Sequence, residues 1–305
     1  MSRKFRLRDN PGDDMHRRDV IRRRTHESHE EALLTVVDGP PEGDRWSTYA
    51  DSGTLHGPAP RPSWVSTGSA AVDHELGIVK TGKEADVFLL RRELPGTDTP
   101  ETGTSTLLAA KRYRDLDHKT FRRDSSYLEG RNVRESRQRR AAANRTAYGR
   151  KLLAGTWAVA EFEVLGAMWE AGAPVPYPVQ LVGTELLMEW IGSPDGVAAP
   201  RLAQLRPKTD ELASLWQQCI EAMTYLARAG LAHGDLSAYN LLVDDGRLVL
   251  IDVPQAVDIV ANPQGMDFLY RDARNVAAWF TARGLPTADP DLLMAELVGC
   301  TGIGG

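Results

Sequence analysis

Residues 231–252, LAHGDLSAYNLLVDDGRLVLID, decide the fold of this chain. The pattern predicts a loop, a short apolar strand, a tight turn at the Asp-Asp-Gly sequence and a second apolar strand that ends at Asp252. Asp235 and Asn240 lie in the loop at the spacing D-x-x-x-x-N. This spacing, followed by an Asp at the end of a strand, is typical of the catalytic loop of phosphotransferases. The sequence therefore predicts a phosphoryl-transfer site.

Three side chains of this segment have distinct expected roles. We expect Asp235 to be catalytic, because a carboxylate at its position orients the attacking hydroxyl or accepts its proton. Asn240 and Asp252 are the expected metal ligands, since their oxygen atoms suit a hard divalent cation. The expected cofactors are ATP and Mg²⁺, with Mn²⁺ as an alternative metal.

A lysine and a glutamate upstream complete the expected nucleotide site. Lys111 ends an apolar strand in the sequence Ala-Ala-Lys. Residues 155–174 predict a helix with Thr156 as its N-cap, and the helical phase places Glu161 on the inward face and Glu163 on the outward face. A strand lysine paired with a helix glutamate holds nucleotide phosphates in kinases, so we expect Lys111 and Glu161 to form this pair.

The glycine-containing segment Gly77-IVKT-Gly82-Lys83-Glu84 resembles a Walker loop but lacks its Ser or Thr, because Glu84 stands at that position. Its flanks predict strand, turn and strand. We therefore expect Thr81, Gly82 and Lys83 to form a turn that covers the nucleotide phosphates, as in kinases.

The remaining patterns predict an α+β fold. Residues 77–92 and 107–114 predict an antiparallel meander, and residues 179–192 predict a β-hairpin. Residues 211–230 and 266–284 have the spacing of amphipathic helices, and the second of these is expected to be the last helix of the chain.

Charge and composition bound the remaining possibilities. The chain has 305 residues and a net charge of −5, and residues 111–151 carry 14 Lys and Arg against five Asp and Glu. Residues 1–70 are rich in Arg, Asp, Gly and Pro without periodicity, so we expect a largely disordered tail. Residues 115–150 are expected to form a basic insertion. Two cysteines without metal-ligand spacing and the absence of long apolar stretches favour a cytoplasmic protein without membrane contact.

These motifs together resemble the RIO family of atypical serine/threonine kinases, particularly its first subfamily. The resemblance rests on TGKEADVF, WAVAEFEVL, LLMEWIG, HGDLSAYNLLV, LIDVPQAVD and FLYRDARNV. It implies a two-lobed kinase-like domain over residues 71–305, with an N-lobe at about 71–190, a C-lobe at about 191–305 and no peptide-docking subdomain. It further implies that Glu189 and Ile191 form the adenine-contacting hinge. The implied activities are ATP hydrolysis, autophosphorylation and phosphorylation of an unknown protein, with Asp252 as a transient phosphoryl acceptor.

Two alternatives remain at this point. A small-molecule phosphotransferase of the aminoglycoside or choline kinase type shares the H-G-D-L loop and the hairpin that follows it. A nucleotide-gated assembly factor would bind RNA or a ribosomal particle through the basic segment 111–151.

Overall fold

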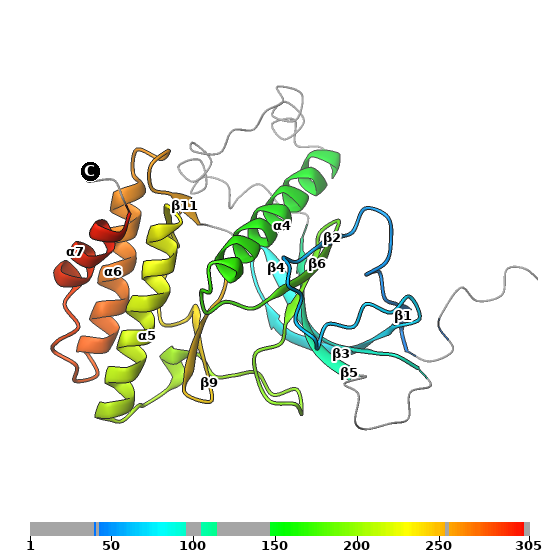
Figure 1. Ribbon diagram of the computed structural model, residues 1–305, viewed down its shortest axis with the longest axis horizontal. Helices are drawn as coiled ribbons and strands as arrows, with labels where there is room; N and C mark the ends of the chain where they lie inside the picture. Colours follow the sequence, from blue (N-terminus) through cyan, green and yellow to red (C-terminus); the bar gives the residue numbers. More distant parts are fainter. Residues whose placement is uncertain (1–39, 41–42, 96–104, 115–146, 254–255, 302–305) are drawn as a thin grey trace, which may run out of the picture. The chain divides into compact units, whose positions relative to one another are not determined.

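The computed structural model describes Pro40 and residues 43–95, 105–114, 147–253 and 256–301, with the backbone alone at 147–153. Apart from Pro40, these residues belong to one compact unit, residues 42–305. Within this unit an antiparallel sheet precedes a mainly helical part (Figure 1). The two-lobed α+β fold predicted from the sequence is confirmed.

The sheet of the first lobe contains seven strands in the order β1-β3-β4-β5-β7-β6-β2, and each neighbouring pair is antiparallel. The predicted meander corresponds to its centre and the predicted hairpin to β6 and β7. The strand bounds are β1 Arg45–Trp46, β2 Leu55–His56, β3 Val72–Thr81, β4 Ala85–Glu93, β5 Ser105–Tyr113, β6 Pro178–Val182 and β7 Glu185–Glu189.

The expectation of a disordered tail up to residue 70 is wrong for residues 43–70. Strand β1 pairs with the start of β3, and β2 pairs with β6 at the opposite edge of the sheet. Val65 is buried beneath the sheet. Neither strand is longer than two residues, so the sequence shows no alternating pattern that would predict them.

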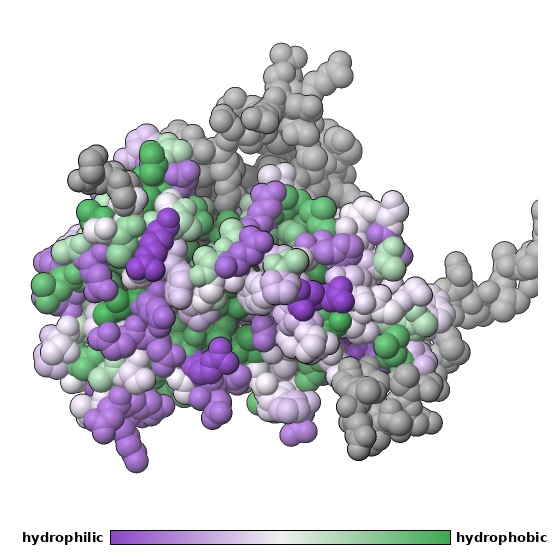
Figure 2. All heavy atoms as spheres, in the orientation of Figure 1, coloured by the Kyte–Doolittle hydropathy of each residue, from purple (hydrophilic) through white to green (hydrophobic). Residues whose placement is uncertain are grey.

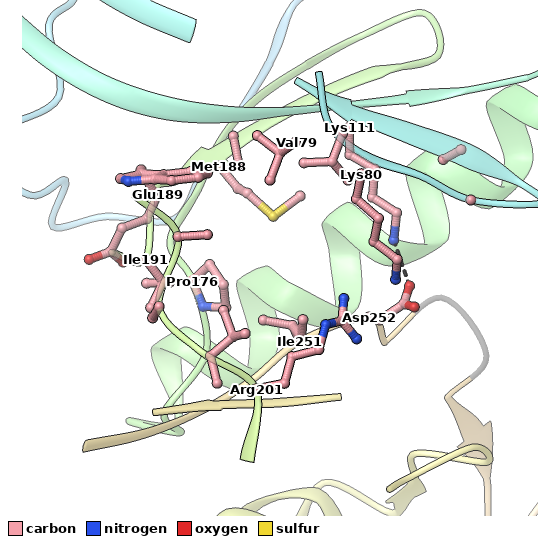
Figure 3. Close-up of a pocket in the computed structure, with 18 of the residues that line it drawn as sticks. Val79, Lys80, Lys111, Pro176, Met188, Glu189, Ile191, Arg201, Ile251 and Asp252 are labelled. Atoms are coloured by element: carbon pink, nitrogen blue, oxygen red, sulfur yellow. Dashed lines mark hydrogen bonds and ion pairs between the residues drawn. The ribbon is translucent and has the colours of Figure 1, made fainter. Parts of the chain in front are cut away.

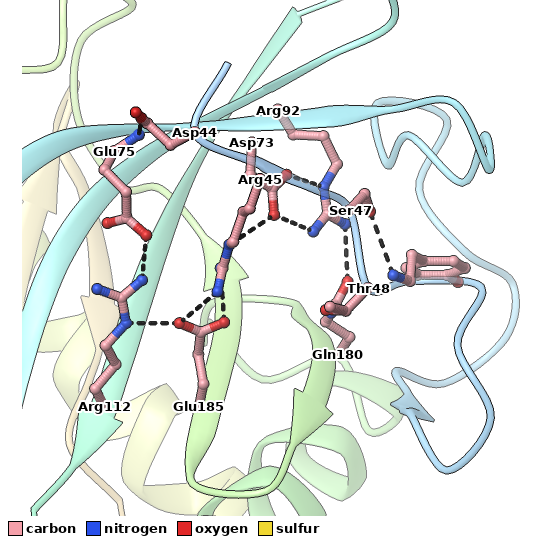
Figure 4. Close-up of polar contacts among 11 residues, drawn as sticks. Asp44, Arg45, Ser47, Thr48, Asp73, Glu75, Arg92, Arg112, Gln180 and Glu185 are labelled. Atoms are coloured by element: carbon pink, nitrogen blue, oxygen red, sulfur yellow. Dashed lines mark hydrogen bonds and ion pairs between the residues drawn. The ribbon is translucent and has the colours of Figure 1, made fainter. Parts of the chain in front are cut away.

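A polar network attaches this N-terminal segment to the sheet (Figure 4). Arg92, only 1% exposed, donates to both carboxylate oxygens of Asp73 over 2.7 and 3.0 Å and to Gln180 over 2.8 Å. Arg45 donates to Glu185 over 2.7 and 3.2 Å, and Glu185 also accepts from Arg112. Because a buried charge is tolerated only when it is paired and hydrogen-bonded, the network fixes the segment against the sheet.

The long helix α4, Ala147–Glu170, lies against the sheet (Figure 1). It begins before the predicted start, so Thr156 lies inside the helix and not at its N-cap. It ends where expected, because Gly172 adopts a φ of 83°, a left-handed conformation that favours glycine.

The second lobe packs helices around a large apolar core. Trp216 of α5 and Phe280 of α6 meet there with ring centroids 5.1 Å apart. The prediction that α6 is the last helix is wrong, since α7 follows it. The bounds are η1 Leu202–Gln204, α5 Thr209–Arg228, β8 Leu231–Ala232, β9 Leu241–Asp244, β10 Arg247–Leu250, β11 Val257–Asp258, α6 Gly265–Thr281 and α7 Pro290–Cys300.

Helices α5, α6 and α7 lie side by side (Figure 1). In the view of Figure 2, hydrophilic side chains project from the helical part and apolar side chains show between them. Among the described residues, no helix is long and apolar enough to cross a membrane.

Candidate active site

A cavity of about 770 Å³ lies between the sheet and the helical part (Figure 3). Strands β3, β4 and β5 line one side, and the segments after β7 and before α5 line the other. Ala109, Met188 and Leu242 are among its apolar lining residues, whereas Lys111, Glu161 and Asp252 gather at one end. The cavity therefore has an apolar part that suits a flat ring and a charged part that suits an anion.

Lys111 and Glu161 form the pair expected from the sequence, and Asp252, expected as a metal ligand, also contacts Lys111. Lys111 Nζ donates to Glu161 Oε1 over 2.7 Å and to Asp252 Oδ1 over 2.8 Å. Glu161 is 1% exposed on α4, while the side chain of Asp252 is 41% exposed. The structure thus brings together residues from β5, from α4 and from the segment after β10.

Tyr113 also belongs to this cluster, although the sequence analysis did not identify it. Its hydroxyl donates to Glu161 Oε2, and its ring lies 5.4 Å from Lys111 Nζ. Tyr113 stands two residues after Lys111 on β5, so both side chains point to the same face of the sheet. The two-residue spacing from Lys111 could therefore have predicted from the sequence that Tyr113 lies beside it.

Mutual attraction of their charges keeps Lys111 and Asp252 ionised. Burial alone would lower the pKa of Lys111, but the carboxylates of Glu161 and Asp252 raise it above its ordinary value. Burial would raise the pKa of Asp252, but the Lys111 ammonium group holds it below its ordinary value. Burial, followed by the nearby Glu161 charge, raises the pKa of the Tyr113 hydroxyl, which therefore stays protonated and able to donate.

The glycine-containing segment forms a strand, a turn and a strand, as predicted. Gly82 N–H donates to Ala85 O over 3.0 Å, and a Cβ atom at position 82 would stand 2.7 Å from that oxygen. Only glycine fits this turn without a shift of the backbone. Gly82 and Lys83 line the cavity, whereas Thr81 is not among the lining residues.

The predicted hinge residues Glu189 and Ile191 also line the cavity. Glu189 Oε2 accepts from Tyr177 N over 3.0 Å, and burial raises the pKa of its carboxyl group. The carbonyl of Ile191 accepts from Ala199 N over 3.0 Å, which fixes the backbone at this edge of the cavity.

Asp235 and Asn240 lie in the loop between β8 and β9, outside the cavity lining. Asn240 Nδ2 donates to the backbone oxygen of Asp235 over 2.9 Å. Ile251 N donates to the backbone oxygen of Asn240 over 3.0 Å, and Ile251 directly precedes Asp252. Hydrogen bonds therefore connect the loop to the charged end of the cavity.

Helix α6 holds this loop in place. The buried carboxylate of Asp272 accepts from Gly234 N over 2.8 Å and from Leu236 N over 2.9 Å. Asn275 Nδ2 donates to the carbonyl of Leu236 over 3.2 Å. The roles of Asp272 and Asn275 were not predicted, although an Asp on the apolar face of a helix is a visible exception to the amphipathic pattern.

Two further cations reach the charged end without having been predicted. Lys80 lies on β3, and Arg201 directly precedes η1. Both residues line the cavity. In Figure 3 their charged groups point toward Asp252.

The predicted metal ligands fit a hard divalent cation by their chemistry, since each offers a side-chain oxygen. Asn240 donates to the backbone oxygen of Asp235 through Nδ2. This bond does not involve Oδ1, which is the atom of Asn240 that would bind a metal. No cluster of three or more His, Cys, Asp and Glu side chains suited to a metal occurs in the described part of the chain. The fit thus depends on a carboxylate and an amide, which phosphoryl-transfer sites combine.

The basic segment, which in one of the two alternatives would bind RNA or a ribosomal particle, lies mostly outside the described residues, which omit 115–146. The structure therefore does not test this alternative for residues 111–151.

Comparison with known proteins identifies the family. The RIO domain family matches residues 105–293. The RIO-type serine/threonine-protein kinase Rio1 of Haloferax volcanii is 37% identical over 234 residues, which cover 77% of this chain and 72% of that protein. The chain belongs to the RIO family.

Other RIO relatives are longer proteins that the chain matches in part. The serine/threonine-protein kinase RIO1 of Caenorhabditis elegans is 35% identical over 223 residues, which cover 73% of this chain and 40% of that protein. The serine/threonine-protein kinase RIO3 of Homo sapiens is 38% identical over 133 residues, which cover 43% of this chain and 25% of that protein. The shared RIO region is thus common to proteins of different total length.

Proposed function

We propose that this chain is an atypical serine/threonine protein kinase and ATPase of the RIO type, dependent on ATP and Mg²⁺. The observation that carries the proposal is the contact of Lys111 with both Glu161 and Asp252 at the charged end of the cavity. The names of the RIO relatives support protein phosphorylation over transfer to a small molecule.

The proposed roles follow from the contacts. Lys111, held by Glu161 and indirectly by Tyr113, binds phosphate oxygens with a permanent positive charge. Asn240 and Asp252 hold the divalent cation, which when bound neutralises charge on the transferred phosphoryl group. Asp235 accepts the proton of the attacking hydroxyl, and its exposure leaves it open to a protein substrate.

The hinge is proposed to bind the adenine ring. Because the carbonyl of Ile191 is occupied by Ala199 N, the Ile191 N–H is the group assigned to a ring nitrogen. Ala109 and Met188 offer apolar surface to the ring faces. Gly82 and Lys83 are proposed to cover the phosphates, and Thr81 to support the turn in which they lie.

Incubation with ATP labelled at its terminal phosphate tests this function. We expect Mg²⁺-dependent release of phosphate and labelling of protein. The Asp235→Ala variant should lose about 10²-fold or more of the turnover while it retains nucleotide affinity, because a base acts in the transition state. The matched control is Asp195→Ala, an exposed carboxylate that does not line the cavity. Undiminished turnover in Asp235→Ala would contradict the proposed role.

A further inference from the structure

Lys80 and Arg201 bring two positive charges to the cavity from opposite lobes. Lys80 lies on β3 of the sheet, and Arg201 lies in the segment between β7 and α5. In Figure 3 the amine of Lys80 and the guanidinium of Arg201 point toward the carboxylate of Asp252, as does Lys111. The proposed function gives neither residue a role.

A bulge in β3 explains why Lys80 reaches the cavity. The pairing of β3 with β4 shifts between Ile78 and Lys80, and both Val79 and Lys80 line the cavity. In a regular strand two successive side chains point to opposite faces. The bulge turns Lys80 toward the cavity, and bulges recur beside functional sites.

The guanidinium of Arg201 is held from its own lobe. It donates to the backbone oxygen of Tyr239, which belongs to the same loop as Asp235. The side chain of Gln204 accepts from Arg201 N over 2.8 Å, so the backbone is fixed as well. An arginine held in this manner still presents other N–H groups to a ligand.

Charge at this end of the cavity is unbalanced. The carboxylates of Glu161 and Asp252 both contact Lys111. Within the described residues, neither Lys80 nor Arg201 forms an ion pair with a carboxylate. Burial, followed by the positive charge of Arg201, lowers the pKa of Lys80, and Lys111 adds to this shift while the Asp252 carboxylate opposes it. Lys80, Lys111 and Arg201 thus outnumber the carboxylates of Glu161 and Asp252 at this end of the cavity, and an excess of positive charge favours a multivalent anion.

We propose that Lys80 and Arg201 form a clamp, with one arm from each lobe, that binds the triphosphate chain of the nucleotide beside Lys111. The inference rests on the proposed function, since it assigns two new phosphate-binding residues to the same site. Arg201 suits phosphate oxygens because its guanidinium can donate two parallel hydrogen bonds, and Lys80 adds a point charge.

Binding of ATP, AMP and inorganic triphosphate, measured by calorimetry without divalent metal, tests the clamp. The variants are Lys80→Met and Arg201→Met, with Lys80→Gln as a second substitution at the first position. The controls are Lys208→Met and Arg206→Met, which remove exposed cations that do not line the cavity. Lys80→Arg and Arg201→Lys test whether charge is sufficient.

We expect each clamp variant to weaken ATP and inorganic triphosphate binding by about tenfold, with AMP binding changed by less than about twofold. The controls should bind as the parent does, and Lys80→Arg should recover most of the affinity. Such selective loss supports the clamp. An equal loss for AMP and ATP would show a structural role, and unchanged ATP binding in the clamp variants would leave the proposed function standing without the clamp.

The probes also separate the two proposals. A parent protein that binds inorganic triphosphate through Lys80 and Arg201 but binds no nucleotide would show an anion site at these residues and would overturn the clamp as a nucleotide site. A parent protein that binds none of the probes would overturn the clamp, whereas the proposed function is overturned only if the parent releases no phosphate from ATP in the presence of Mg²⁺.

Discussion

Lys111 and Glu161 stand 50 positions apart in the chain, yet Lys111 Nζ lies 2.7 Å from Glu161 Oε1. The contact joins β5 to α4 in a region where both side chains are buried. Since a buried carboxylate near a lysine fixes where the ammonium group lies, Glu161 positions the ammonium group that we propose binds phosphate.

The first prediction follows from this pair. In Glu161→Gln the amide loses the negative charge that positions Lys111, so ATP turnover should fall by about tenfold or more, equivalent to about 1.4 kcal/mol of transition-state stabilisation. Steady-state phosphate release measures it. Glu163→Gln is the matched control, because Glu163 is exposed on the opposite face of α4. Similar losses in both variants would contradict the role of Glu161.

The second prediction concerns the attachment of the loop to α6. Asp272→Asn replaces one acceptor oxygen by an NH₂ group that faces a backbone N–H, so one of the bonds to Gly234 and Leu236 is lost. We expect the free energy of unfolding to fall by about 1–3 kcal/mol. Urea unfolding measures this, and turnover should fall as well because the loop carries Asp235. Asp267→Asn, on the exposed face of the same helix, should remain close to the parent in both measurements.

The third prediction is the pH dependence linked to the same carboxyl group. Burial raises the pKa of Asp272 above its ordinary value of 3.8, although the charge of His233 opposes the shift. Because the pKa of Asp272 is higher in the folded state, its carboxyl group contributes to the free energy of unfolding at a pH below 3.8. This contribution is lost as the pH rises through the folded-state pKa. We therefore expect the parent to lose stability relative to Asp272→Asn as the pH rises from the ordinary pKa to the folded-state pKa. The measurement is the difference between their free energies of unfolding across this pH range. An increase would contradict the direction of the shift.

The fourth prediction tests the polar network at the N-terminal segment. Asp73→Ala leaves the buried Arg92 without its carboxylate, so the free energy of unfolding should fall by about 3–5 kcal/mol. The double variant Asp73→Leu with Arg92→Met should recover much of the loss, because an apolar pair removes the uncompensated charge. Chemical denaturation measures both. Asp86→Ala, which breaks the exposed pair with Arg114, is the control and should change stability little.

Local patterns explain which parts of the structure the sequence predicts. Hairpins and helices depend on neighbouring residues, so the strands around Lys111, the hairpin β9–β10 and the inward phase of Glu161 could be predicted. The same holds for the end of α4 at Gly172. Each of these features is determined by a local hydrophobic period and by a turn residue that ends the element.

Other features depend on contacts between distant segments. Strands β1 and β2 are short, and their attachment depends on pairs such as Arg45 with Glu185, which are 140 positions apart. Lys80 reaches the cavity through a bulge, and a bulge moves a side chain to a face that the period of two does not predict. Arg201 and Lys80 line the same cavity only because the two lobes face each other. No short window of sequence contains that information.

The last prediction concerns Asp252 as a phosphoryl acceptor, a role implied by the resemblance to RIO kinases. Asp252 adopts a φ of 65°, and its partly exposed carboxylate points into the charged end of the cavity (Figure 3). In the proposed step a carboxylate oxygen of Asp252 attacks the terminal phosphorus, the bond to the bridging oxygen breaks, and ADP leaves with the bonding electrons. Water then hydrolyses the acyl phosphate.

Hydroxylamine distinguishes this acyl phosphate from a phosphate ester, because it cleaves the former and leaves phosphoserine intact. After a brief incubation with labelled ATP, we expect protein-bound label that hydroxylamine removes. Peptide mapping after borohydride reduction should then place the modified residue at Asp252. Asp252→Asn alone cannot decide the matter, since the substitution also removes a proposed metal ligand and so lowers all phosphoryl transfer. Label that withstands hydroxylamine and maps to a serine would instead show that Asp252 holds the metal without accepting the phosphoryl group.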